Sequence, residues 1–277
     1  MPRRWSLAHG YSLTIGPIYH IMGILNITPD SFFDGGSYLA IDDAVYHALN
    51  MVKQGATIID IGGESTRPCG SSIDAKTEQK RILPVIEQLA DRGDVIISVD
   101  TYRSETAQLA LDVGAHIIND VWGCQHDCSL AQIAASTGAG LVLMSNRRKH
   151  DFGSDLIEDT KKSLLHSLKI ASVAGVEASQ IVLDPGFGFS STTDHDILML
   201  RNLEKLHDLG FPLLVGTSCK RFLGEITGRD VIDRSVSTSA TSVFARQKGS
   251  AIFRVHDIVM NKDALAVADA LMNLRQS

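Results

Sequence analysis

The chain has 277 residues, of which 44% are hydrophobic and 21% are charged, and its formal net charge is −6. This composition is typical of a globular domain and excludes a disordered chain or a collagen-like repeat. The sequence contains no run of about 18 apolar residues, which is the length that a bilayer-spanning helix needs. No signal-peptide pattern follows the basic start, so we expect a cytoplasmic protein. The acidic balance argues against nucleic acid as a partner, since nucleic-acid binders usually carry a basic excess or a basic stripe. The short basic cluster at 147–149 is typical of a solvated loop.

The four cysteines are too few and too scattered for a disulfide scaffold. Cys124, His126 and Cys128 are close enough in sequence to bind a metal. A zinc site needs four ligands, however, and no second Cys/His pair lies nearby. We therefore interpret this stretch as an incidental loop.

Short runs rich in Ile, Val and Leu recur along the whole chain, at a mean spacing of about 33 residues that suits a βα unit. Continuous apolar runs of this kind are typical of strands buried on both faces of a parallel sheet. The runs lie at 21–25, 57–61, 95–99, 116–118, 141–144, 181–183, 213–215 and 251–255.

Amphipathic stretches with helical periodicity separate these runs. They lie at 42–54, 77–89, 104–113, 130–136, 154–174, 194–209, 235–247 and 262–274. Several of them end in a glycine, at Gly55, Gly114, Gly138 and Gly210, and glycine suits the left-handed conformation that ends many helices.

Eight strands in strict alternation with eight helices predict an α/β fold, a single-domain (β/α)8 TIM barrel. We expect it to cover residues 20–277, with residues 1–19 as an N-terminal cap segment or hairpin at the base of the barrel. The alternative is an open, doubly wound sheet. No Gly-x-Gly-x-x-Gly motif opens a helix after the first strand, which weakens a dinucleotide-binding interpretation.

Polar residues follow every predicted strand, and in a (β/α)8 barrel the carboxyl ends of the strands build the active site. One such residue alone is often a helix cap or an ion pair, an interpretation that we favour for Asp120 and Asp257. The whole set is hard to explain by structure alone and predicts a site at one mouth of the barrel. The strand ends carry Asn26, Asp60, Asp100, Asn119, Asn146, Asp184, Lys220, Arg254 and His256.

One half of this set suits a polyphosphate. Arg254 and His256 are two residues apart on a strand and so point the same way, and Arg67 can add a third donor to phosphate oxygens. A local ion pair with Asp257 is the alternative for the first two. Oxygen ligands for a hard cation such as Mg²⁺ are available from Asn26 and Asp34.

The other half suits a flat heterocycle rich in hydrogen-bonding groups. Carboxylates can accept from a guanidine-like edge, an amide can donate and accept, and a lysine can donate to a ring carbonyl or nitrogen. Gly186 and Gly188 allow the backbone to approach closely, and Phe189 can supply a ring face. Taken singly, an aspartate before proline can be a turn residue and a lysine can lie on the surface. The four polar residues are Asp100, Asn119, Asp184 and Lys220.

Seven segments in this order closely resemble the signatures of dihydropteroate synthases, and the resemblance runs from about residue 20 to the C-terminus. The segments are 22–36, 60–68, 98–101, 118–121, 183–189, 216–218 and 254–257. The first, the second and the last are long and specific, whereas Gly-Thr-Ser at 216–218 is weak by itself.

The resemblance implies a folate-pathway transferase on a (β/α)8 barrel, as a homodimer. Such an enzyme condenses 6-hydroxymethyl-7,8-dihydropterin pyrophosphate with p-aminobenzoate to give 7,8-dihydropteroate and pyrophosphate. It uses Mg²⁺, and sulfonamides compete for its p-aminobenzoate pocket. The implied partners are therefore small-molecule substrates and a second copy of the chain, with no nucleic acid and no membrane.

The resemblance also assigns roles to individual residues. Asp100, Asn119, Asp184, Phe189 and Lys220 would bind the pterin. Asn26, Arg67, Arg254 and His256 would bind pyrophosphate, with Asn26 and Asp34 near Mg²⁺. Thr66, Pro68, Phe189, Lys220 and Arg221 would frame p-aminobenzoate. The residues expected to be catalytic are Asp100, Lys220, Arg254 and His256.

Three positions depart from the family pattern: the segment 143–147, Cys219 and Arg221. None of these changes removes a residue assigned to the chemistry, and Arg221 could pair with the carboxylate of p-aminobenzoate. Two other functions remain open. A corrinoid methyltransferase would need the pterin pocket but no pyrophosphate clamp, and an inactive paralogue would bind the pterin without turnover.

Overall fold

A computed structural model describes residues 2–28, 38–64, 72–146, 155–189 and 192–272. Its centre is a parallel sheet in the order β8-β7-β6-β5-β4-β3-β10-β9, and a parallel bridge between Leu183 and Leu213 joins the two ends. The strands are β3 (His20–Asn26), β4 (Ile58–Gly62), β5 (Ile96–Asp100), β6 (Ile117–Asp120), β7 (Gly140–Met144), β8 (Ile181–Asp184), β9 (Leu214–Val215) and β10 (Ile252–Val255). The predicted barrel is therefore confirmed, and the open-sheet alternative is wrong.

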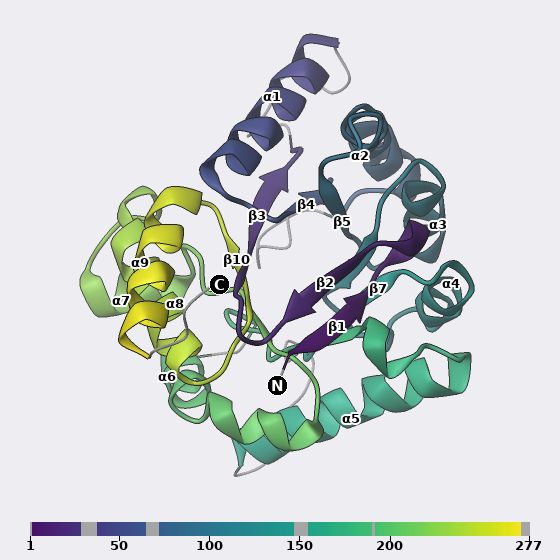
Figure 1. Cartoon of the computed structure of the whole chain (residues 1–277). Helices are drawn as coiled ribbons and strands as arrows, with labels where there is room; N and C mark the ends of the chain where they lie inside the picture. Colours follow the sequence, from purple (N-terminus) through teal and green to yellow (C-terminus); the bar gives the residue numbers. More distant parts are fainter. Residues whose placement is uncertain (1, 29–37, 65–71, 147–154, 190–191, 273–277) are drawn as a thin grey trace.

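Helices surround this sheet on its outer side (Figure 1). They are α1 (Tyr38–Gln54), α2 (Ala75–Ala90), α3 (Ser104–Asp112), α4 (Ser129–Thr137), α5 (Leu156–Ala174), α6 (Thr193–Arg201), α7 (Arg221–Thr227), α8 (Ser235–Gln247) and α9 (Ile258–Leu271). Short 3-10 turns are η1 (Ala8–Gly10), η2 (Ala178–Gln180), η3 (Leu203–Leu209) and η4 (Val231–Asp233). No described helix is both long and apolar enough to cross a membrane.

Two segments differ from the prediction. The stretch expected as one helix at 194–209 divides into α6 and the 3-10 turn η3. Helix α7 was not predicted, because its seven residues make about two turns, too few for a helical period to stand out. It matters for the site, since it begins directly after Lys220.

The end of the barrel interior opposite the carboxyl ends of the strands, called the lower end below, is apolar and is covered by an N-terminal hairpin. Strands β1 (Arg3–Ser6) and β2 (Ser12–Ile15) pair antiparallel and cross the barrel in Figure 1. Trp5, Leu7 and Ile15 from this hairpin form one buried cluster with strand residues that include Met22 and Ile252. The hairpin thus keeps water out of the end of the barrel opposite the strand carboxyl ends.

Trp5 also makes a hydrogen bond across this contact, since its indole Nε1 donates to the carbonyl of Gln180 at 2.7 Å. Replacing Trp5 by Phe should lower the free energy of unfolding by about 1 to 2 kcal/mol, because a buried carbonyl loses its partner. Urea unfolding followed by circular dichroism measures this change. An unchanged midpoint and slope would contradict a stabilising role of this hydrogen bond.

A buried ion pair fastens α8 to α9 away from the mouth. The Arg246 guanidinium donates to both carboxylate oxygens of Asp269, at 2.6 and 3.2 Å. It also donates to the carbonyls of Gly16 and Pro17, between the hairpin and β3. Both side chains are almost completely buried, so this pair is a structural joint and contains none of the residues predicted to bind substrate.

Candidate active site

The barrel interior has an apolar lower part and a polar upper part, and alternation along each strand decides which residues face it. On β4, Ile59 and Ile61 pack with the outer core, and Ile58 packs with the lower interior. Asp60 lies two residues beyond Ile58 and so faces the same interior, one layer higher. Its carboxylate is completely buried. The residues above this level on the neighbouring strands are those that the sequence predicts to bind substrate.

Arg254 is the centre of the polar layer. Its Nε donates to Oδ2 of Asp60, and its Nη2 donates to Oδ2 of Asp100, both at 2.6 Å. Oδ2 of Asp60 also accepts from Nδ2 of Asn119 at 3.0 Å. Strands β4, β5, β6 and β10 thus contribute to a single network, which joins the predicted phosphate half of the site to the predicted heterocycle half.

The charges of this network act on one another strongly, because both carboxylates are buried. Burial raises the pKa of Asp100 to about 7, although the positive charge of Arg254 opposes this shift. The pKa of Arg254 is raised, since the charges of Asp60 and Asp100 outweigh the effect of burial. Arg254 therefore stays protonated at every ordinary pH, whereas Asp100 can gain or lose its proton near neutrality.

Asp184 closes the other side of the site and shapes the loop behind it. Its Oδ1 accepts from the backbone N–H of Gly186 at 2.7 Å, so it has the turn role that we gave as the alternative. A Cβ atom on Gly216 would lie 4.0 Å from Oδ2 of Asp184 and 3.8 Å from Cβ of Arg254. Asp184 is therefore both a turn residue and a neighbour of the Arg254 side chain.

Lys220 and Phe189 form a wall of the mouth. The Lys220 Nζ lies 4.8 Å from the centre of the Phe189 ring, within the range of a cation–π contact. The stem of Lys220 crosses Gly188, where a Cβ atom would lie 2.5 Å from its Cδ. Gly188 also has a φ of +75°, so both space and backbone conformation require glycine there.

His256 and Asn26 lie at the rim. His256 is exposed, with its Nδ1 2.9 Å from the hydroxyl oxygen of Ser218, and the same oxygen accepts from the His256 backbone N–H at 3.2 Å. Asn26 ends β3 and is half-buried. Its register partner on β4 is Gly62, which places its amide above the polar layer.

Some predicted site residues are not brought into contact with this network. Arg221 begins α7, is largely exposed and pairs with Glu225 at 3.1 Å. Thr66, Arg67, Pro68 and Asp34 lie outside the described residues. The roles of these residues stay predictions.

The alternative of a local ion pair between Arg254 and Asp257 is wrong. Asp257 caps α9 by accepting from the backbone N–H of Met260 at 3.0 Å, and Arg254 pairs with carboxylates on other strands. Asp120 also has the structural role that we favoured, since its oxygens accept from the backbone N–H groups of Trp122 and Cys124.

Asp60 and Ser218 are site residues to which sequence reasoning gave no role. The signal for Asp60 was a charged residue inside an otherwise apolar run, at the interior position of a strand buried on both faces. Ser218 had no such signal, because a serine after a strand is common in loops.

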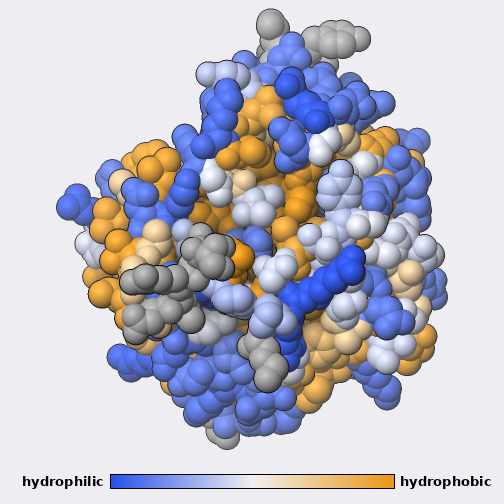
Figure 2. Space-filling model, viewed as in Figure 1, coloured by the Kyte–Doolittle hydropathy of each residue, from blue (hydrophilic) through white to orange (hydrophobic). Residues whose placement is uncertain are grey.

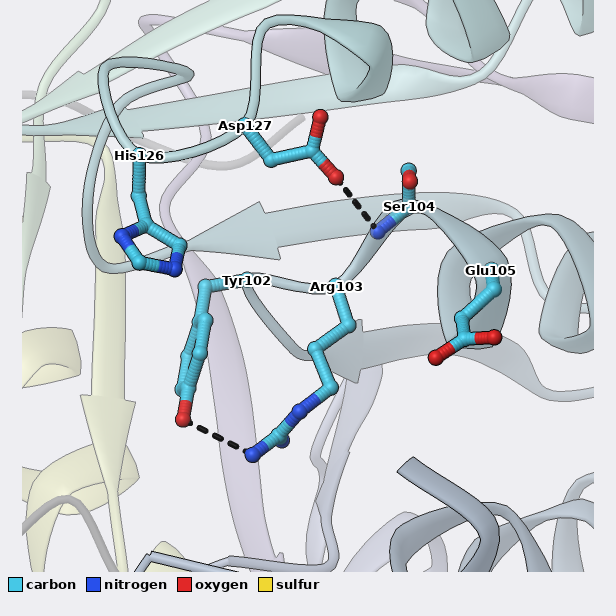
Figure 3. A pocket seen from close by; sticks show the side chains of 6 residues that line it. All are labelled: Tyr102, Arg103, Ser104, Glu105, His126 and Asp127. Atoms are coloured by element: carbon cyan, nitrogen blue, oxygen red, sulfur yellow. Dashed lines mark hydrogen bonds between the residues drawn. The ribbon is translucent and has the colours of Figure 1, made fainter. Parts of the chain in front are cut away.

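A shallow pocket lies beside the mouth, between the loops that follow β5 and β6 (Figure 3). Its lining includes Tyr102, Arg103, His126 and Asp127. The ring of Tyr102 meets that of His126 edge-on, with their centres 5.3 Å apart. None of the lining residues was predicted to bind substrate.

The comparisons with known proteins agree with this geometry. The family described as pterin binding enzymes matches residues 22–256. The dihydropteroate synthase of Bacillus subtilis is 44% identical over 253 residues, which cover 91% of this chain and 88% of that protein.

Two solved structures extend the likeness to three dimensions. A dihydropteroate synthase from Clostridium difficile, determined in the presence of pteroic acid, has a TM-score of 0.90 at 42% identity and covers 93% of this chain and 98% of its own. The Xanthomonas albilineans dihydropteroate synthase in complex with 7,8-dihydropteroate has a TM-score of 0.87 at 34% identity. That match covers 96% of this chain and 98% of the other.

The family match over residues 22–256, on a (β/α)8 barrel with carboxylates, an amide and an arginine at the carboxyl ends of its strands, places the chain in the class of pterin-binding barrel enzymes. Within that class, the chain belongs to the dihydropteroate synthase family.

Proposed function

We propose that the mouth of this barrel condenses 6-hydroxymethyl-7,8-dihydropterin pyrophosphate with p-aminobenzoate, giving 7,8-dihydropteroate and pyrophosphate. The observation that carries the proposal is the network in which Arg254 joins Asp60, Asp100 and, through Asp60, Asn119. It places acceptors for a pterin edge directly beside a guanidinium that suits phosphate oxygens. A methyltransferase of the corrinoid type has no need of a guanidinium that binds pyrophosphate.

The pterin would lie on the polar layer. Asp100 and Asp184 accept from its N–H groups, Asn119 donates and accepts, and Lys220 donates to a ring acceptor. Asp100, Asn119 and Asp184 lie on strands of a closed barrel, and Lys220 directly precedes α7, so little conformational entropy is lost when the ring binds. The ring is thereby held with its exocyclic methylene toward the rim.

The pyrophosphate would extend from that methylene toward Arg254 and His256, with Arg67 as a further donor. Of the two residues that we expect to bind Mg²⁺, Asn26 is a half-buried amide at the rim whose oxygen is a suitable ligand, and Asp34 lies outside the described residues. Bound Mg²⁺ would neutralise part of the charge on the pyrophosphate oxygens. The cationic side chains stabilise the charge that develops on the leaving oxygen.

The bond change needs positioning more than it needs a strong base. The aniline nitrogen attacks the methylene carbon, the carbon–oxygen bond breaks, and pyrophosphate leaves with the bonding electron pair. The nitrogen then releases one proton, and no bond to the protein forms. Holding both reactants in line supplies a large part of the rate enhancement.

The amine substrate would lie between the pterin and the outer wall. Phe189 and Lys220, which contact each other, would also contact it, and we assign Thr66, Pro68 and Arg221 to the same pocket. Arg221 would have to exchange Glu225 for the substrate carboxylate. Sulfonamides, which share the aniline group, are expected to compete at this pocket.

Leaving out one component at a time tests the proposal. Purified protein with the pterin pyrophosphate, Mg²⁺ and p-aminobenzoate should release pyrophosphate, and omission of p-aminobenzoate should stop the release. Chromatography should show 7,8-dihydropteroate in the complete mixture alone. Binding of the pterin without release would instead favour the inactive paralogue.

Affinity for the pterin ring should depend on pH through Asp100. The raised pKa of this carboxyl, to about 7, means that protons compete with the ring for it below neutrality. The dissociation constant of 6-hydroxymethylpterin should rise by up to about tenfold per pH unit below that value. Calorimetry between about pH 5 and pH 9 measures this, and Asp100→Asn should bind weakly with a much flatter profile. A flat profile for the unchanged protein would contradict the role of Asp100.

We also propose that two copies of the chain associate through η4, α8 and α9. Large apolar side chains are exposed there, including Ile232, Val236, Val267 and Leu271, and apolar surface is visible over α7 to α9 in Figure 2. Exposed apolar patches of this kind often mark a protein–protein contact. Sedimentation equilibrium should give twice the mass of one chain, and Val267→Glu should shift the measured mass toward that of a single chain.

A further inference from the structure

A hydrogen-bonded cluster lies at the two ends of segment 65–71. Glu64 directly precedes this segment, and Ile73 follows it by two residues. Arg103, in the loop after β5, reaches both: its Nη2 donates to Oε2 of Glu64 at 2.7 Å and to the carbonyl of Ile73 at 2.6 Å. The backbone N–H of Ile73 lies 3.5 Å from the same Glu64 oxygen. One guanidinium therefore ties together two points that are nine residues apart.

Neighbouring side chains hold Arg103 in this position. The Tyr102 hydroxyl lies 2.8 Å from the same Nη2, as Figure 3 shows, and that hydroxyl donates to Glu64 at 3.1 Å. Nη1 of Arg103 lies 3.1 Å from Oε2 of Glu78, and Glu78 is fixed by the hydroxyl of Thr106 at 2.8 Å. The Tyr102 hydroxyl and both carboxylates thus constrain the guanidinium directly, and the Thr106 hydroxyl constrains it through Glu78.

The cluster is shielded from water, which separates it from an ordinary surface ion pair. The side chains of Arg103 and Glu64 are 14% and 13% exposed, and that of Glu78 is 1% exposed. Exposed pairs typically contribute little, but a shielded charge that loses its partner is strongly unfavourable. The hydrogen bond from Arg103 to Glu64 and the charges of Glu78 and Glu64 raise the pKa of the guanidinium, against the effect of burial.

A purely structural explanation accounts for only part of this arrangement. Packing of α2 on α3 needs the contact between Arg103 and Glu78, since Glu78 lies on α2 and Arg103 directly precedes α3. It does not need Glu64, which follows β4, or the carbonyl of Ile73, which precedes α2 and its cap Asp74. Two of the strongest contacts of Arg103 therefore serve the ends of segment 65–71.

We propose that Arg103 is a positioning residue for the amine substrate: it fixes both ends of segment 65–71, which contains Thr66, Arg67 and Pro68. The inference rests on the proposed function, in which these three residues contact p-aminobenzoate or pyrophosphate. In general, holding two points of a chain at a fixed separation limits the conformations open to the residues between them, and preorganisation of this kind strengthens binding. Arg103 itself touches no substrate.

The test compares Arg103→Met with Arg103→Lys. Met should raise the KM for p-aminobenzoate by about tenfold or more, while calorimetry should give a dissociation constant for 6-hydroxymethylpterin within about twofold of the unchanged protein. Lys keeps the charge but lacks the fork that bonds several partners. The KM of Arg103→Lys for p-aminobenzoate should therefore lie between that of the unchanged protein and that of Arg103→Met. An unchanged KM for p-aminobenzoate, or an equal loss of affinity for both ligands, would overturn the proposal.

Arg246→Met is the matched control, because it breaks another shielded arginine–carboxylate pair that lies away from the mouth. It should lower the stability of the fold without raising the KM for p-aminobenzoate relative to pterin affinity. Hydrogen exchange gives a second readout: a peptide covering 64–74 should exchange at least about tenfold faster in Arg103→Met and not in Arg246→Met. Equal exchange in the two variants would overturn the positioning role of Arg103, even if the chain made no dihydropteroate. Absence of product from the unchanged protein would overturn the proposed function alone.

Discussion

Replacing Arg254 by Met should lower kcat/KM for the pterin pyrophosphate by about 10⁴-fold. Two effects add. The leaving pyrophosphate loses a cationic donor, a loss that alone typically costs 10²- to 10³-fold. Asp60 and Asp100 also lose their shared partner inside the barrel, and an unpaired buried carboxylate takes up a proton or distorts the site. Steady-state kinetics with saturating p-aminobenzoate measure the change.

Arg254→Lys separates these two effects. A lysine keeps one positive charge but cannot bond to both carboxylates and the leaving group at once, so its kcat/KM should be intermediate. Circular dichroism and thermal unfolding establish that each variant is folded. A loss of less than about tenfold in folded Arg254→Met would contradict the central place of this side chain.

Asp60→Asn should lower kcat/KM for the pterin pyrophosphate by about 10²- to 10³-fold and leave the KM for p-aminobenzoate nearly unchanged. In the unchanged chain a single oxygen of Asp60 accepts from both Arg254 and Asn119. A neutral amide accepts more weakly from the guanidinium and brings an N–H group that has no acceptor of its own there. Both halves of the substrate would then be held less rigidly.

Asp120→Asn is the matched control for this substitution. Asp120 is as completely buried as Asp60 and also lies near the end of a strand, but it bonds to the backbone of its own loop. Its change should reduce stability and alter kcat/KM by no more than about threefold. Equal effects of the two substitutions on kcat/KM would show that Asp60 acts through stability alone.

The architecture could be predicted from the sequence because it depends on local patterns. Apolar runs at regular spacing, and the glycines that end helices at Gly138 and Gly210, indicate alternating strands and helices without knowledge of distant contacts. The rule that barrel strands carry function at their carboxyl ends then brought Asp100, Asn119 and Arg254 together. The network in the structure contains all three.

The pairing within the site could not be predicted, because it is made across the barrel. Arg254 and Asp60 are separated by 194 residues, and nothing local distinguishes Asp60 from Asp257 as the partner of Arg254. The contact becomes evident only when β10 and β4 flank β3 in the closed sheet. Arg103 was missed for the same reason, since its partners come from the ends of two other elements.

A single-turnover reaction tests most directly whether this mouth joins the two substrates. Enzyme in excess over the pterin pyrophosphate is mixed with Mg²⁺ and p-aminobenzoate, and 7,8-dihydropteroate and pyrophosphate are quantified over time. We predict that the unchanged protein converts the bound pterin fully, with one pyrophosphate for each dihydropteroate, and that folded Asp184→Asn is slower by at least about 10²-fold. Pterin binding without dihydropteroate, or equal rates for the two proteins, would contradict the account.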